Sequence, residues 1–270
     1  MRQKLRIRWK ALKMEIKEHK SSFVVYMVLR ALVILVMILQ ILNRNYEDVF
    51  YCVLTLLLLI VPSFLQVGLK IDLPMTLEII ILLFIFSAEI LGEIGAYYTR
   101  VPNWDTMLHT LNGFLVAAIG FSLVDILNRD ERAKFNLSPL YMAVVAFCFS
   151  MTVGVLWEFF EFSMDWFFGL DMQKDWIVPA INSVKLNPTG ANIPIHVDVQ
   201  SVVINGETWN LGGYLDIGIV DTMKDLMVNF VGAVVFSAIG ILYLKHRGKG
   251  KLAASLIPQV RDTDAEVSEK

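Results

Sequence analysis

Residues 22–42 read SFVVYMVLRALVILVMILQIL, an apolar segment with a single charged side chain, Arg30. At a rise of about 1.5 Å per residue, about 20 apolar residues are enough for a helix to cross the hydrocarbon core of a bilayer. Further segments of comparable length and apolar character are 49–66, 75–97, 105–127, 139–162 and 221–244. The sequence therefore predicts an all-α fold, a polytopic membrane bundle of six transmembrane helices.

The composition of the whole chain agrees with a membrane protein. Hydrophobic residues make up 56% of its 270 residues, and its mean hydropathy is +0.58. Ordinary globular chains are about 45–50% apolar, and a disordered chain is less apolar still. Two cysteines, Cys52 and Cys148, are too few for a disulfide scaffold. The expected partner is the lipid bilayer and not nucleic acid, because the excess of basic over acidic residues is confined to the chain ends.

Those basic ends predict the orientation of the chain. Residues 1–20 and 245–270 together hold 14 Lys/Arg and 6 Asp/Glu, which leaves 10 basic and 20 acidic residues between them. Cytoplasmic segments are enriched in Lys and Arg, so we expect a plasma (inner) membrane protein with both termini in the cytoplasm. Residues 1–21 would form a basic amphipathic surface segment and 245–270 a cytoplasmic tail. No small-residue cleavage site follows the first apolar segment, so we expect it to be retained as an anchor.

The long connection 163–220 lies outside the cell in this orientation. Within it, Asn205-Gly206 separates two short segments of strand-forming residues, 202–204 and 207–209. Asn-Gly accepts the positive φ values of a two-residue hairpin turn. The sequence therefore predicts a short extracytoplasmic β-hairpin on a membrane domain that spans 22–244.

Nine ionisable residues and one amide gather near the outer ends of the last four predicted helices. They are Glu89 and Glu93 in the third, Asp105 and His109 in the fourth, Glu158, Glu161 and Asp165 in the fifth, and Asp221, Asp225 and Asn229 in the sixth. Neighbours within a helix are mostly three or four residues apart and share a face. A charge inside the bilayer costs about 2.5–3.5 kcal/mol, so we expect an outward-facing acidic/His pocket. Small residues that continue these faces, Gly113, Gly154 and Gly232, indicate close helix packing below it.

Crowded carboxylates must be protonated, paired with cations or bound to a metal ion. Nearby basic residues are few, namely Arg100 and Lys224. One solution is a divalent ion such as Mg, Mn, Fe or Zn, and the other is a retained proton. The candidate metal ligands are His109, Asp105, Glu158, Asp221 and Asp225. The candidate catalytic residues are Glu158, Glu161 and His109, with Glu158 or Glu161 as general base, and the supporting residues are Glu89, Glu93, Asn229 and Trp157.

Simpler roles compete with each of these assignments. Asp105 and Asp221 also suit helix caps, and a lone histidine such as His109 is more often a packing residue than a ligand. Arg30 lies within the first predicted helix, where it either reaches lipid headgroups or pairs with Glu78 or Asp125. A shared functional site is favoured because the polar residues occur at one depth on four helices.

The motifs resemble those of a known family. LGEIGAYYTRVPNWDTMLHTLNGF (91–114), VLWEFFEFSMD (155–165) and GGYLDIGIVDTMKDLMVNFVGA (212–233) are similar to the YjdF-like family of bacterial inner-membrane proteins of unknown function. The order of the Asp105, His109, Glu158, Asp225 and Asn229 motifs also resembles VanZ-like proteins, a group associated with glycopeptide resistance. The chain departs from the latter because no matching Gln and Arg pair precedes the last helix.

Three functions fit these features. The first is metal-assisted hydrolysis or modification of an envelope lipid or cell-wall precursor, although no nucleophile motif, Walker loop or H-E-x-x-H sequence is present to fix a reaction class. The second is a proton- or cation-coupled carrier or channel, and the third a non-catalytic membrane scaffold. A carrier should show polar or broken helices near the midplane. Residues 54–60 and 143–149 read as unbroken and apolar, which favours a one-sided pocket.

The predicted orientation can be tested with single cysteines at Lys174 and Lys249 in a background without Cys52 and Cys148. An impermeant thiol reagent applied to intact cells should label position 174, because the long connection lies outside, and should leave position 249 unlabelled. The opposite pattern would reverse the topology and place the acidic residues on the cytoplasmic side.

Overall fold

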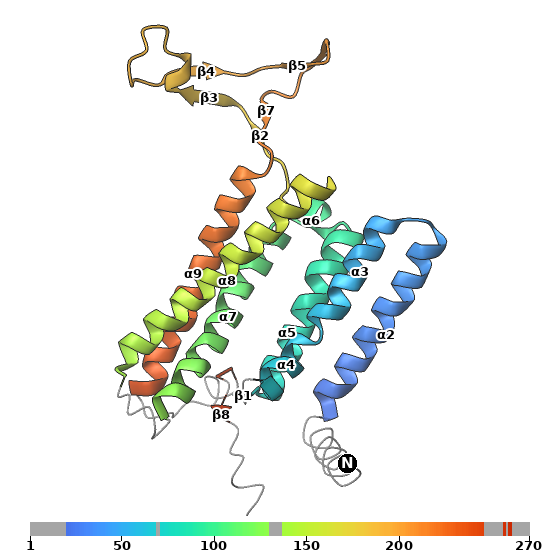
Figure 1. Cartoon of the computed structure of the whole chain (residues 1–270), viewed down its shortest axis with the longest axis vertical. Coiled ribbons are helices and arrows are strands. Elements are labelled where there is room, and N and C mark those ends of the chain that lie inside the picture. The colour runs from blue at the N-terminus through green and yellow to red at the C-terminus, as the bar shows by residue number, and fades with distance from the viewer. Residues whose placement is uncertain (1–19, 69–70, 130–136, 246–255, 258, 261–270) are drawn as a thin grey trace, which may run out of the picture. The chain divides into compact units, whose positions relative to one another are not determined.

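The computed structural model describes residues 20–68, 71–129, 137–245, 256–257 and 259–260. Within these ranges, six helices are long and apolar enough to cross a membrane, which confirms the predicted number (Figure 1). Their bounds are Ser21–Leu42, Tyr46–Gln66, Met75–Ile94, Trp104–Asn128, Pro139–Phe168 and Ile219–Lys245. Nearly all of the basic segment 1–21, the whole of the connection 130–136 and most of the tail 245–270 lie outside the described residues.

The chain forms two compact units, one of residues 1–152 and 228–270 and one of residues 153–227. Helices α8 (Pro139–Phe168) and α9 (Ile219–Lys245) are continuous and contribute residues to both.

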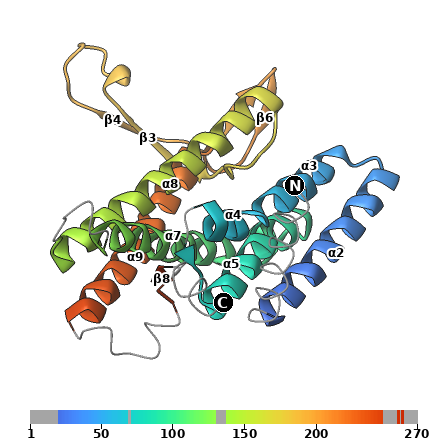
Figure 2. The same ribbon diagram turned by 60° about the horizontal axis from the view of Figure 1, so that its bottom comes forward.

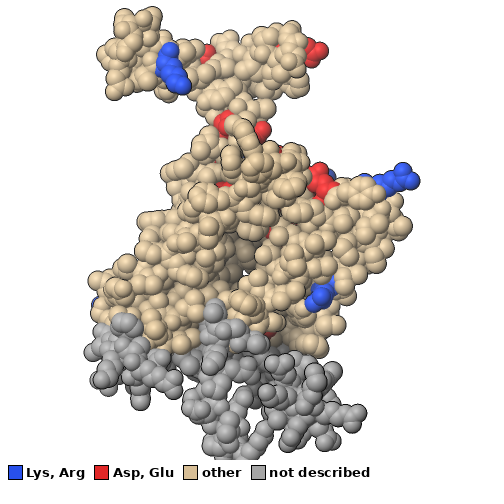
Figure 3. All heavy atoms as spheres, in the orientation of Figure 1, with Lys and Arg blue, Asp and Glu red and all other residues tan. Residues whose placement is uncertain are grey.

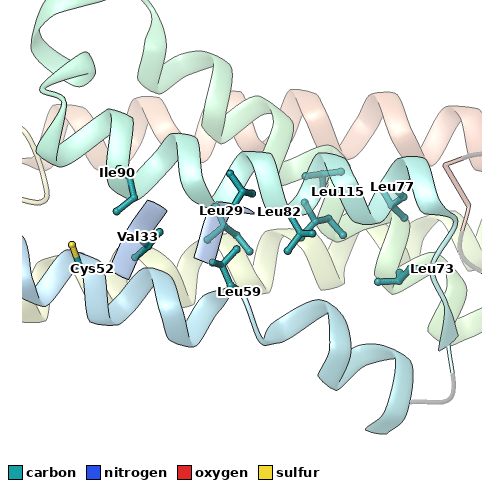
Figure 4. Close-up of a cluster of buried hydrophobic side chains, with 11 residues drawn as sticks. Leu29, Val33, Cys52, Leu59, Leu73, Leu77, Leu82, Ile90 and Leu115 are labelled. Carbon is teal, nitrogen blue, oxygen red and sulfur yellow. The ribbon is translucent and has the colours of Figure 1, made fainter. Parts of the chain in front are cut away.

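One hydrophobic core of the first unit lies among α2 (Lys20–Leu42), α3 (Tyr46–Leu58) and α5 (Met75–Phe86), which run side by side (Figures 1 and 2). Val33, Cys52 and Leu77 are fully buried there (Figure 4). Cys52 is thus a packing residue, whereas Cys148 is exposed. On the face seen in Figure 3, few charged side chains interrupt the surface of the described helices, as expected for helices that contact lipid.

The second span is not one unbroken helix, so the expectation for residues 54–60 was wrong. Helix α3 ends at Leu58, Leu59 and Ile60 form a turn, and α4 (Val61–Gly68) follows. Pro62 explains the interruption, because proline has no N–H to donate to the carbonyl of Leu58 four residues earlier. The proline is visible in the sequence, and its effect on the span was missed.

The third span changes its helix type halfway. After α5, residues Ser87–Ile94 form a π-helix, η1, and the Gly95 N–H donates to the Ile90 carbonyl five residues earlier at 2.9 Å. Ala96 then adopts a left-handed φ of 56° before the short helix α6 (Tyr97–Arg100). The span therefore ends at Ile94 and not at residue 97.

Helix α7 (Trp104–Arg129) and the part of α9 in the first unit cross at very short range. A Cβ atom at Gly113 would lie 2.0 Å from the Asn229 carbonyl oxygen, and one at Gly232 would lie 1.9 Å from that of Thr110. Only glycine permits this approach of the two backbones. The predicted close packing at Gly113 and Gly232 is thereby confirmed.

The second unit carries three antiparallel strand pairs between its helical ends. The predicted hairpin is confirmed, with β5 (Val202–Ile204) paired to β6 (Glu207–Trp209) and positive φ at Asn205 and Gly206. Two further pairs were not predicted, and their strands are β2 (Ile177–Val178), β3 (Ala180–Ser183), β4 (Ile195–Asp198) and β7 (Tyr214–Leu215). In the first unit, β1 (Ile71–Asp72) pairs with β8 (Gln259–Val260).

Three aspartates hold the segment 172–176 of the second unit. Both Asp165 oxygens accept backbone N–H groups, from Met172 at 2.6 Å and Gln173 at 2.8 Å. Asp221 accepts from the Lys174 backbone at 3.0 Å and from the Trp176 indole at 3.2 Å. Asp216 accepts from the Trp176 backbone at 2.8 Å and caps α9 through the Val220 N–H at 2.6 Å.

The α7–α9 crossing predicts that Gly113→Ala and Gly232→Ala each destabilise the protein, by about 1–3 kcal/mol, because the added methyl group meets backbone atoms that cannot rotate away. Chemical unfolding of the protein in detergent measures this loss. Val231→Ala, at an exposed position of the same helix, should change stability far less. Glycine variants as stable as the wild type would contradict the close approach.

Asp216 predicts a pH dependence. Burial opposes its ionisation, but the backbone N–H donors of Trp176, Val220 and Gly218 prevail and hold its pKa below the usual range. Its charge therefore stabilises the fold above the ordinary aspartate pKa of about 3.9, and this stability is lost as the pH falls through the lower folded value. Asp216→Ala should cost about 0.5–2 kcal/mol as a lost helix cap.

The pH effect itself is measured with Asp216→Asn, which removes the charge and keeps an oxygen acceptor. Its thermal midpoint in detergent should lie below that of the wild type at neutral pH, and the gap should close on acidification. The exposed Glu207→Gln serves as control. A gap that persists at the lowest pH would show that the charge is not responsible.

Candidate functional site

Asp105 and His109 form a partly buried pair in the first turns of α7. His109 Nε2 lies 3.3 Å from Asp105 Oδ1, and the two side chains are 13% and 18% exposed, respectively. They are four residues apart and so share a face of the helix. The pair confirms that His109 lies beside an acidic neighbour, as the spacing of four residues predicts.

A polar contact fixes α7 against α9 just below this pair. The Asn112 amide donates to Asn229 Oδ1 at 3.1 Å, and the Asn229 amide lies 3.5 Å from Met151 Sδ. The Ser150 hydroxyl donates to the Gly113 carbonyl at 2.8 Å, which links α8 to the same point. Asn229, expected as a supporting residue, is 1% exposed and belongs to the framework of the crossing.

Asp225 lies one turn before Asn229 on the continuous helix α9 and is equally buried, at 1% exposure. Residues four apart share a helix face. Asp105, His109 and Asp225 form an Asp-His-Asp group that could hold a metal ion. Of the five ligands expected from the sequence, these three make up that group.

Glu158 and Glu161, the expected general bases, are both buried in α8. Trp157 donates its indole N–H to Glu161 Oε1 at 2.7 Å. Trp157, expected as a supporting residue, therefore orients one of the two carboxylates. The roles of Glu158 and Glu161 in catalysis stay predictions.

Asp221 and Asp165 make hydrogen bonds that the sequence analysis did not anticipate. Both carboxylates hold the returning segment 172–176, as described above. Asp221, expected as a metal ligand, uses both of its oxygens for these contacts. Its ligand role stays a prediction, and its observed role is to anchor the segment to the start of α9.

Glu89 and Glu93, the expected supporting acids, both lie on the π-helix η1. Glu89 is 4% exposed, whereas Glu93 is partly buried. The π-helical geometry was not predicted, because hydrophobic periodicity does not distinguish π from α turns over eight residues.

Arg30 has a partner that neither sequence-based alternative included. Its guanidinium donates to the hydroxyl of Tyr26 one turn earlier and lies 5.7 Å from the centre of that ring. Within the described part of the chain, no hydrogen bond or ion pair joins Arg30 to Glu78 or Asp125. A tyrosine four residues before an arginine in a helix is a signal that could have predicted this contact.

Sequence reasoning also missed Asp216, Gln173 and Trp176. Asp216 is 6% exposed and caps α9, Gln173 donates to the Thr222 hydroxyl, and Lys224 lies 5.3 Å from the Trp176 ring centre. The aspartate three residues before α9 is an N-cap signal that was available in the sequence. The contacts of Gln173 and Trp176 join residues more than 40 positions apart and had no local signal.

Comparison with known proteins gives a family and no activity. No curated protein and no solved structure matches the chain. Residues 25–246 match the family described as "Predicted membrane protein (DUF2238)". The matched range takes in all but the first turn of the six candidate spans, in agreement with the resemblance drawn from the motifs. The chain therefore belongs to the DUF2238 family of predicted membrane proteins.

Proposed function

We propose that the protein is an inner-membrane, metal-dependent hydrolase or modifying enzyme that acts on an envelope lipid or cell-wall precursor. Asp105, His109 and Asp225 are the proposed ligands of one divalent ion, at the outer ends of α7 and α9. The observation that carries the proposal is the Asp105–His109 pair, held directly above a crossing that glycines keep tight.

The donor set and spacing of the pair support a metal. Ligand atoms bound to one tetrahedral ion at 2.0–2.2 Å lie about 3.4 Å apart, and His109 Nε2 lies 3.3 Å from Asp105 Oδ1. An imidazole nitrogen with carboxylate oxygens suits Zn, Mn or Fe, and Mg is compatible with the carboxylates.

The contacts between α7 and α9 below the pair support a functional site and not merely a polar patch of surface. The Asn112–Asn229 hydrogen bond and the glycine contacts fix α7 against α9. A metal site needs its ligands held by side chains and backbone that do not relax. The same contacts would keep Asp105 and His109 in place during turnover.

In the proposed reaction, the bound ion would lower the pKa of a water molecule and polarise the substrate. Glu158 or Glu161 would act as general base toward that water. The Trp157 indole, which donates to Glu161, would set the direction of one of these carboxylates. With both termini cytoplasmic, the substrate would approach from outside the cell or from the outer leaflet.

A second function is supported by the interruptions in two spans. The turn at Leu59 and Ile60 divides the second span, and the π-helix η1 forms the second half of the third. Carriers use broken and irregular helices at their transport paths, and π-helical turns are frequent at functional sites. These features favour a proton- or cation-coupled carrier more strongly than the sequence alone favours one.

Metal binding separates the proposed enzyme from a scaffold. Full-length protein in detergent is equilibrated with Mn²⁺ or Zn²⁺, desalted and analysed for metal content. We expect one bound ion per chain and an affinity at least 10-fold lower for His109→Gln and Asp225→Asn, because even outer-shell partners of a metal site contribute about 10–100-fold.

The chain offers a matched control in a second histidine–aspartate pair. His196 Nε2 lies 3.1 Å from Asp198 Oδ1 in the strand pair of β3 and β4, and both side chains are exposed. His196→Gln should leave the metal content unchanged. If the wild type takes up no metal, or if His109→Gln keeps it while His196→Gln loses it, the proposed site is wrong. Thermal midpoints of all variants show whether each one is folded.

A further inference from the structure

Glu89 is a buried acid that the proposed metal site does not use. Its side chain is 4% exposed, less than the neighbouring Ile90 at 6%. The π-helix that carries it is tightly covered, because a Cβ atom at Gly92 would lie 2.3 Å from the ring of Tyr98. As a residue, Glu89 is thus as little exposed as its aliphatic neighbour in the core.

No described residue donates a hydrogen bond to Glu89 or forms an ion pair with it. The elements that contact η1 most extensively are α3, α5, α6 and α7. Their titratable side chains that the structure describes are Tyr46, Glu47, Asp48, Tyr51, Cys52, Glu78, Tyr97, Tyr98, Arg100, Asp105, His109 and Asp125, with Glu93 on η1 itself.

This set is acidic or neutral, with two exceptions. Arg100 is exposed at the end of α6, and His109 lies against Asp105. Neither gives Glu89 a buried counter-charge. An ionised carboxylate that is removed from water and left without a cation is so unfavourable that the group takes up a proton instead.

We propose that Glu89 is a proton-binding site of the third span, a carboxylic acid that holds an exchangeable proton at neutral pH. The π-helix supports this assignment, because such irregular turns persist mainly where function requires them. The site is independent of the proposed metal. In a carrier, Glu89 would be the group that takes up and releases the proton. In an enzyme, it would make the activity depend on the external pH.

Dicyclohexylcarbodiimide tests the proposal, since this apolar reagent modifies protonated carboxyl groups away from water. The acid gives its proton to a reagent nitrogen while its oxygen bonds to the central carbon, so the protein gains the mass of one whole reagent. Full-length protein in detergent, with a chelator present, is labelled at neutral pH and mapped by peptide mass spectrometry. We expect the label at Glu89, with less of it at mildly alkaline pH.

Glu93→Gln is the matched control on the same π-helix and should keep the label, whereas Glu89→Gln should lose it. Glu89→Gln should also keep or raise the thermal midpoint, because it replaces one neutral group by another. A large fall in that midpoint would instead indicate a charged Glu89 with a stabilising partner.

Infrared spectroscopy of the wild type makes the test independent of variant folding. A carbonyl band of a protonated carboxyl group should be present and should shift in D₂O. The proposal would be overturned if both that band and the Glu89 label were absent. It would also be overturned if sodium salts blocked the labelling at constant pH. The metal-uptake measurement is unaffected by either result, so the two proposals fail separately.

Discussion

The close crossing of α7 and α9 is the contact on which the arrangement of the candidate site depends. Gly113 and Gly232 bring each helix against backbone carbonyls of the other, and the buried Asn112–Asn229 pair fixes their register. Helices in lipid gain little from the hydrophobic effect when they associate, so such close backbone contacts and polar pairs carry much of their packing. The Asp105–His109 pair lies within two turns of this point on α7, and its spacing of four residues places both side chains on one face of that helix.

The carboxylates at the helix ends that adjoin the connection 163–220 and the turn before α7 have separate tasks. Asp165, Asp216 and Asp221 accept backbone and indole N–H groups and so hold the segment 172–176. Asp105 instead faces an imidazole, and Glu161 an indole. A buried carboxylate that stays charged needs hydrogen-bond donors for its lone pairs, and the donors differ from site to site. Acidic residues at one depth therefore do not by themselves amount to one pocket.

The irregular spans connect local chemistry to function. Pro62 removes one helical hydrogen bond and divides the second span, while η1 widens the third at the point where Glu89 is enclosed. Irregular backbone at membrane depth is tolerated only where it is covered by protein or lines a cavity. The proposed metal ligands on α7 and the proposed proton-binding acid on η1 are compatible with one protein that couples chemistry to proton binding.

The sequence alone determined the number of spans, their approximate ends, the hairpin at Asn205-Gly206 and the close packing at Gly113 and Gly232. Each of these depends on residues near one another in the chain. The length of an apolar segment predicts a span, the turn residues predict the hairpin, and small residues three or four positions from a polar residue predict close packing. Tertiary structure decided the rest. The contact of Trp176 with Asp221 and the enclosure of Glu89 depend on which distant segments supply donors or cover a side chain. Periodicity in one helix contains no information about those neighbours, and this is why the sequence placed the acids together but could not assign their partners.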